Sequence, residues 1–119
     1  ASQARLLFIT SAKSDLEFRM QQITQRKLNL SRKSQTISEQ QTMCFNQLNN
    51  NSLSPEQKAY YENFQMQLEC ALKGLQIQDK NLELEMKNID SQHKALETEY
   101  ESVKKVIDKN IEMSFKYFA

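Results

Sequence analysis

The feature that most constrains this 119-residue chain is an apolar side chain that recurs every seven residues in both halves. The repeat runs from Ile9 to Cys44 and then again from Tyr61 to Val103. A strict seven-residue spacing keeps one stripe of a helix against a partner only if the helices supercoil in the left-handed sense. We call these residues the seam: Ile9, Leu16, Ile23, Leu30, Ile37, Cys44, Tyr61, Leu68, Leu75, Leu82, Ile89, Leu96 and Val103. The spacing predicts a coiled coil.

Glycine and proline are almost absent, with one residue of each. Turns depend on these residues, so a β-rich or α/β fold is excluded and the chain is predicted to be all-α. The only proline, Pro55, follows a cluster of Asn and Ser residues. Ser54 suits the N-cap of a helix, Pro55 suits its first position, and Gln57 completes a capping box.

The Asn and Ser cluster and Pro55 divide the chain into two helices and a short loop. We expect helix 1 at about 3–49, a loop at 50–54 and helix 2 at about 55–117. Together they form a single helical hairpin domain, residues 1–119. The one internal glycine, Gly74, costs helix 2 about 1 kcal/mol relative to alanine and could allow a bend there.

The positions of the seam residues predict which of them face each other across the hairpin. If the chain folds back at the loop, Ile9 falls near Leu96, and Cys44 falls near Tyr61. The result is an antiparallel two-helix hairpin. A second stripe beside the seam is mixed in character, and there Lys27 falls opposite Asp79.

Charge supports the antiparallel pairing. Residues 1–50 carry seven basic and three acidic side chains, for a net charge of +4, whereas residues 51–119 carry nine basic and twelve acidic, for −3. At the flanks of the seam, Arg5 is predicted to face Glu99, and Arg19 to face Glu85. Exposed pairs contribute only about 0.2–1 kcal/mol each, so they select the orientation more than they supply stability.

The hairpin leaves an overhang at the end of helix 2. The part of helix 2 that pairs with helix 1 ends near Val103. The segment from Lys104 to Ala119 therefore has no helix against it. This segment spans about 24 Å at 1.5 Å per residue and carries an apolar stripe. An exposed apolar stripe of this size indicates a binding surface. The predicted assembly interface consists of Val106, Ile107, Ile111, Met113, Phe115, Tyr117 and Phe118.

An acidic stripe is the second feature that the hairpin leaves unexplained. Glu62, Glu69, Glu83, Asp90 and Glu97 share one heptad position, and the matching stripe of helix 1 cannot neutralise them. The stripe is either a solvated face or a surface that packs against basic residues of a neighbouring molecule.

No catalytic, cofactor-binding or metal-binding residues are expected. His93 is the only histidine; it falls in the mixed stripe opposite Lys13, where a structural role is expected. Cys44 and Cys70 lack a CxxC spacing, which argues against zinc and favours reduced thiols. A formal charge of +1 and the absence of a long apolar run argue against nucleic-acid binding and a membrane span. The chain is therefore not expected to be an enzyme.

The architecture resembles the axial proteins of bacterial type III secretion systems, namely the needle, rod, hook and other flagellar subunits. The resemblance rests on a small helical hairpin without a cleaved signal, a polar Ser/Pro loop and an apolar C-terminal helix. It implies that Asn50–Pro55 is the tip loop, that Ile107–Phe118 is the assembling end, and that subunits stack into a hollow filament. It also favours a filament outside the cell or on its surface, exported without a cleaved signal, with the cytoplasm as the alternative.

Two functions remain open from the sequence. The first is a self-assembling structural subunit of a helical filament or tube, whose partner is the protein itself. The alternative is a cytosolic coiled-coil adaptor or secretion chaperone that binds another helical protein through the same tail. A dimer of hairpins that forms a four-helix bundle is a third and weaker possibility.

Overall fold

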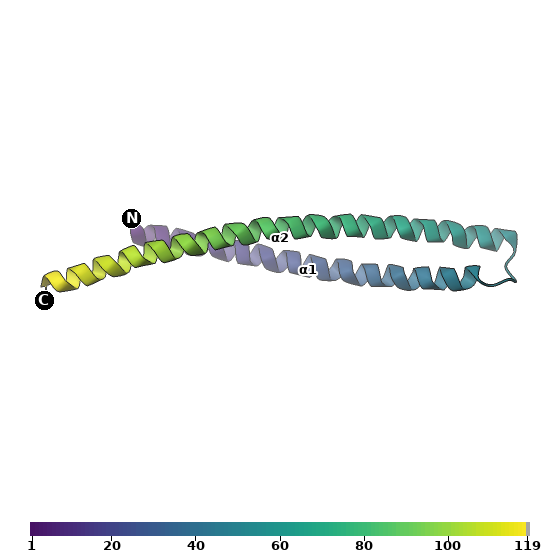
Figure 1. Ribbon diagram of the computed structural model, residues 1–119, viewed down its shortest axis with the longest axis horizontal. Coiled ribbons are helices and arrows are strands. Elements are labelled where there is room, and N and C mark those ends of the chain that lie inside the picture. Colours follow the sequence, from purple (N-terminus) through teal and green to yellow (C-terminus); the bar gives the residue numbers. More distant parts are fainter. Residues whose placement is uncertain (119) are drawn as a thin grey trace. The chain divides into compact units, whose positions relative to one another are not determined.

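A computed structural model describes residues 1–118 of the chain (Figure 1). It consists of two helices, α1 (Ser2–Leu48, 47 residues) and α2 (Pro55–Phe118, 64 residues), and it contains no strand within the described residues. The predicted fold class is confirmed: the protein is an all-α, antiparallel two-helix coiled-coil hairpin with an overhanging C-terminal helix. The helix bounds lie within one residue of those expected, and Ala119, the last residue of the predicted domain, lies outside the described residues.

The loop between the helices is held by the predicted capping box. The backbone N–H of Gln57 donates to the Ser54 hydroxyl at 3.2 Å, and the backbone N–H of Ser54 donates to the Gln57 side-chain oxygen at 3.0 Å. Two of the free backbone N–H groups at the start of α2 are thereby paired. At the end of α1, the Asn50 side chain accepts a bond from the backbone N–H of Ser52 at 3.0 Å, which tightens the turn.

The contacts of the chain group into two compact units. The sequence predicted one hairpin domain, but a two-helix hairpin is thin, and its side chains meet only near neighbours across the seam. We describe the units separately and call them the loop unit, Thr24–Leu84, and the terminal unit, residues 1–23 with 85–118.

In the loop unit, α1 and α2 bury seam residues from both helices. Leu30, Cys44 and Leu68 are buried, whereas Ile37, Tyr61, Leu75 and Leu82 are half-buried. Lys27 bridges the helices, because its ammonium lies 3.6 Å from the Asp79 carboxylate and 3.2 Å from that of Glu83. The predicted pairing of Lys27 with Asp79 is therefore confirmed.

In the terminal unit, three isoleucines form the most buried part of the seam. Ile9 and Ile23 are 0% exposed and Ile89 is 6% exposed, while Leu16, Leu96 and Val103 are half-buried. Full burial of such a side chain contributes about 1.5–3 kcal/mol. The two predicted ion pairs also form: the Arg5 Nε donates to Glu99 at 2.7 Å, and the Arg19 Nε donates to Glu85 at 2.9 Å. The antiparallel orientation predicted from charge is thus present.

One predicted contact of the terminal unit is replaced by others, although the Arg5–Glu99 and Arg19–Glu85 pairs form as predicted. His93 was expected opposite Lys13, but its ring contacts Glu17 at 2.9 Å and Glu97 at 3.4 Å. The Lys13 ammonium instead lies 5.0 Å from the centre of the Tyr100 ring. A heptad repeat fixes which side chains face the partner, but an antiparallel seam can interleave at more than one offset. The packing of the side chains selects the offset.

Three of the five members of the acidic stripe have partners that lie outside the matching stripe of helix 1. Glu83 pairs with Lys27 of α1, Asp90 pairs with Lys94 at 3.0 Å, and Glu97 lies beside His93. Two of these partners come from one helical turn along α2 itself, a spacing at which side chains meet. The acidic stripe therefore does not by itself require a basic neighbour.

Candidate assembly surface

The C-terminal end of α2, which we call the tail and define as residues 108–118, is exposed at every residue. Figure 1 shows α2 continuing past the first residue of α1 in the terminal unit. The tail starts later than the sequence predicted, because the first turn of α1 reaches Ile107 and leaves it half-buried. The expected overhang from Lys104 is therefore shortened by about one helical turn.

The structure places the predicted interface residues at different degrees of exposure. The predicted assignment of Ile107 to the free surface needs correction, since α1 covers part of it. Val106 is 50% exposed and precedes the tail in the sequence. Within the tail, the exposed fractions are 62% for Ile111, 60% for Met113, 76% for Phe115, 85% for Tyr117 and 85% for Phe118. Five large apolar side chains thus lie on eleven consecutive residues without a partner in the chain.

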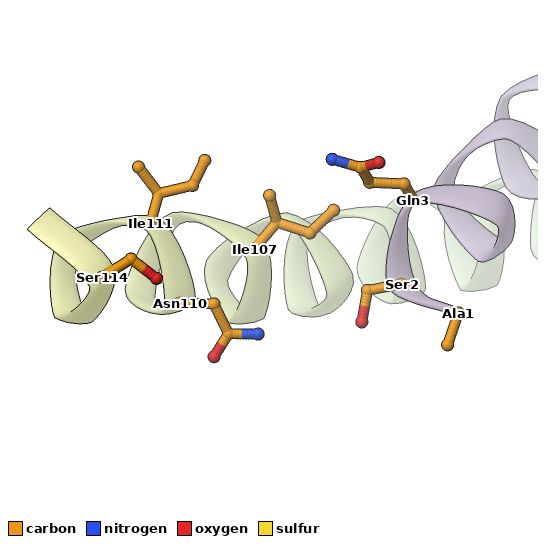
Figure 2. A pocket seen from close by; sticks show the side chains of 7 residues that line it. All are labelled: Ala1, Ser2, Gln3, Ile107, Asn110, Ile111 and Ser114. Atoms are coloured by element: carbon orange, nitrogen blue, oxygen red, sulfur yellow. The ribbon is translucent and has the colours of Figure 1, made fainter.

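An open groove marks the place where α1 stops and the tail begins (Figure 2). It has a volume of about 440 Å³ and is lined by Ala1, Ser2, Gln3, Ile107, Asn110, Ile111 and Ser114. Figure 2 shows Ile107 and Ile111 projecting from the same side of α2, with Gln3 of α1 extending toward Ile107 and Asn110 projecting the opposite way. The apolar stripe of α2 therefore continues beyond the helix that covers it.

The apolar stripe changes phase in the tail. The seam and its neighbouring stripe predict Asn110 as the next inward residue after Ile107, but the apolar residue is Ile111. Ile107, Ile111, Ser114 and Phe118 then follow at spacings of four, three and four. Two successive spacings of four, from Val103 to Ile107 and from Ile107 to Ile111, amount to a four-residue insertion in the heptad pattern. Such an insertion is a stutter, which locally unwinds the supercoil. The tail thus carries a heptad pattern of its own.

Charge in the tail is arranged away from this stripe. Glu112 and Lys116 pair with each other at 3.4 Å along the helix, and both are well exposed. Residues 104–118 contain four lysines and two acidic residues, for a net charge of +2. Two of these lysines, Lys104 and Lys105, precede the tail; within the tail itself two lysines balance two acidic residues, so its net charge is zero.

No group of three or more His, Cys, Asp or Glu side chains within residues 1–118 could hold a metal ion. Neither described helix combines the length and apolar character that crossing a membrane requires. Cys44 lies buried in the seam, and Cys70 is exposed; both are free thiols.

Comparison with known proteins yields no matching family model, no similar curated protein and no similar solved structure. The functional argument therefore rests on the tail and on the surfaces of the hairpin.

Proposed function

We propose that this protein is a self-assembling structural subunit of a helical filament or tube, held together by its apolar C-terminal tail. The observation that supports this proposal is the exposure of Ile111, Met113, Phe115, Tyr117 and Phe118 on one unpaired helical segment. Burial of apolar area drives association, and a large side chain contributes about 1.5–3 kcal/mol when it is fully buried.

The helical state of the tail supports the same proposal. An isolated helix of eleven residues is marginal in water, because nucleating a helix is costly. The tail avoids that cost, since it grows from the paired part of α2 without a break. It therefore presents its apolar side chains in a fixed arrangement before any partner binds, which reduces the entropy lost on association.

The form of the assembly follows from symmetry. If the tail binds a different surface of the next molecule, the contact is heterologous, and a heterologous contact that does not close produces an open helical array. The resemblance to type III secretion axial proteins, drawn from the sequence, favours the same arrangement, with the C-terminal helix as the assembling end. The alternative, an adaptor or secretion chaperone whose tail binds another protein, predicts a chain that stays monomeric when it is pure.

The test is to compare the full chain with a variant that ends after Ile107. We expect the full chain to form filaments or large oligomers as its concentration rises, and the shortened chain to stay a monomeric helical hairpin. Sedimentation velocity and negative-stain electron microscopy report assembly, and circular dichroism reports whether the hairpin is intact. The double variant Lys109→Gln, Lys116→Gln is the matched control, because it changes the tail but keeps its apolar face. A shortened chain that still polymerises, or a full chain that remains monomeric, would overturn the proposal.

A further inference from the structure

An open groove between α1 and α2 in the loop unit has a basic rim. It has a volume of about 380 Å³ and receives residues from both helices. Ile37 and Leu75 are half-buried and line it with apolar atoms, whereas Arg32 and Lys33 are exposed. We call this surface the basic groove; its lining consists of Arg32, Lys33, Thr36, Ile37, Ala71 and Leu75.

The two cations of the basic groove have no acidic partner in the chain. Arg32 and Lys33 take part in none of the ion pairs found among residues 1–118. They are the only charged residues from 28 to 38 of α1, so this stretch has a net charge of +2. No carboxylate lines the groove. A partner that complements it therefore offers an apolar side chain flanked by negative charge.

The loop unit itself carries an apolar side chain of this kind, Met66. The Met66 side chain is 68% exposed. Glu62 precedes it by four residues and Glu69 follows it by three. Residues three and four apart are neighbours on the surface of a helix, so the two carboxylates flank the methionine. We call Glu62, Met66 and Glu69 the acidic edge.

The carboxylates of the acidic edge are unpaired as well. Glu62 and Glu69 form none of the ion pairs found among residues 1–118, and neither do Lys58 and Lys73, which lie one further turn away on either side. The two glutamates are the only charged residues from 59 to 72, so this stretch has a net charge of −2. Its charge is equal and opposite to that of the α1 stretch at the basic groove.

The acidic edge is distinct among the exposed apolar surfaces of the chain. Within residues 1–118, no other large apolar side chain that is exposed has a carboxylate one turn before it and one turn after it. Ile77 and Leu84 have lysines in both places, and so does Met113 in the tail. The tail as a whole has no net charge. The acidic edge of a second copy is therefore the occupant that the charge of the basic groove favours.

The basic groove and the acidic edge lie on different sides of α2. Ala71 and Leu75 follow Met66 by five and nine residues. At 3.6 residues per turn these separations correspond to rotations of about 140° and about 180° around the helix axis. One molecule can therefore receive a neighbour in its groove while its own acidic edge binds another.

We propose that the acidic edge of one copy packs into the basic groove of a second copy. Met66 then contacts Ile37 and Leu75, and the two glutamates lie beside Arg32 and Lys33. The inference rests on the proposed function and adds a side-to-side contact between hairpins to the contact made by the tail. Because the donating and receiving surfaces differ, the contact is heterologous and can repeat from one copy to the next. Exposed ion pairs are weak, so this contact orients neighbours that the tail holds together.

Charge reversal tests the contact in the full chain. The acidic variant combines Glu62→Lys with Glu69→Lys, the basic variant combines Arg32→Glu with Lys33→Glu, and the compensated variant carries all four changes. These side chains are exposed, so the hairpin should persist, which circular dichroism checks. Each double variant places like charges against each other and should need an about tenfold higher concentration to assemble at low salt. The compensated variant should assemble like the wild type. Sedimentation velocity measures all three.

The matched control combines Lys80→Glu with Lys87→Glu. It changes the net charge by the same amount as the basic variant, but both lysines lie outside the basic groove and the acidic edge. We expect the control to assemble at a lower concentration than the basic variant. A basic variant that matches the control, or a compensated variant as weak as the double variants, would overturn the contact.

The chain that ends after Ile107 separates this inference from the proposed function. If that chain fails to assemble while the charge variants assemble like the wild type, the role of the tail stands and the side-to-side contact is wrong. If that chain still assembles while the double variants are weakened, the side-to-side contact stands and the role of the tail is wrong. A wild-type chain that stays monomeric at every concentration would overturn both.

A disulfide between copies tests the same contact directly. Cys70 is first replaced by serine, because it is the exposed native thiol, whereas Cys44 is buried. One chain then carries Met66→Cys and a second carries Thr36→Cys, and mild oxidation of the mixture should give a cross-linked pair of twice the 14.0 kDa chain mass. Each chain alone reports cross-linking to itself. The matched control uses Gln67→Cys in place of Met66→Cys, and equal cross-linking from positions 66 and 67 would contradict the proposed packing.

Discussion

Two stretches of α2 in the terminal unit carry the same kind of side chain in opposite environments. Ile89 lies in the paired stretch and is 6% exposed, whereas Ile111 lies in the tail and is 62% exposed. Both stretches are continuous helix with an apolar stripe and charged flanks. The difference is only that α1 covers one of them. Helix formation and burial are thus separable here: the helix continues from its own hydrogen bonds, but its apolar face is stabilised only where another helix packs on it.

The largest expected effect is on the free energy of unfolding, when the same substitution is made separately in each of the two stretches. Ile89→Ala should lower the free energy of unfolding by about 2–5 kcal/mol, because it removes buried methyl groups and leaves a cavity. Ile111→Ala should change it by less than about 0.5 kcal/mol, the usual range for exposed positions. Urea unfolding followed by circular dichroism, at concentrations where the protein is monomeric, measures both. Equal losses would mean that the tail is covered within the monomer.

A smaller effect is expected from the loop, where folding can be weakened without touching the tail. Ser54→Ala removes the hydroxyl that accepts the Gln57 backbone N–H, and should cost about 1 kcal/mol of hairpin stability. Ser52→Ala is the matched control, since the bond at this position uses the Ser52 backbone N–H. Thermal unfolding measures the cost, and sedimentation should show assembly of both variants unchanged while the hairpin is folded. Loss of assembly in the Ser54 variant alone would show that the loop takes part in it.

The smallest effect concerns charge pairs in the two stretches. The Arg19–Glu85 pair joins the two helices, and its side chains are 44% and 33% exposed. A double-mutant cycle with Arg19→Gln and Glu85→Gln should give a coupling of about 0.2–1 kcal/mol that decreases with added salt. The Glu112–Lys116 pair lies within the tail, so its coupling should be undetectable in the unfolding of the hairpin. Equal couplings would contradict the independence of the tail.

Several elements of the fold could be read from particular residues. The seven-residue spacing from Ile9 to Cys44 identified the inward face, and the buried positions of the structure lie on it. Ser54 and Gln57 located the start of α2, because a capping box is a local interaction between neighbours in the sequence. Arg5 and Glu99 identified the antiparallel orientation, since long side chains reach a partner over a range of offsets.

The sequence predicted the candidate assembly surface less completely than it predicted the fold. Exposure of Ile111, Phe115 and Phe118 followed from the unequal lengths of the helices. The cover over Ile107 and the Glu17 carboxylate beside His93 did not, because both depend on the offset between α1 and α2. The exposed residues Cys70, Ile77 and Leu84 were also missed, because their seven-residue spacing is masked by the stronger seam on the same helix.

What the sequence determined by itself is local and periodic: two helices, the loop between them, the face that each helix turns inward and the apolar character of the tail. These properties depend on residues close together in the chain. Only the tertiary structure decided the offset of the helices, the pairing of Glu83 with Lys27, and the residue at which the tail becomes free. The physical reason is that neighbouring offsets satisfy the same heptad pattern. The choice among them is made by packing and by ion pairs between residues far apart in the sequence.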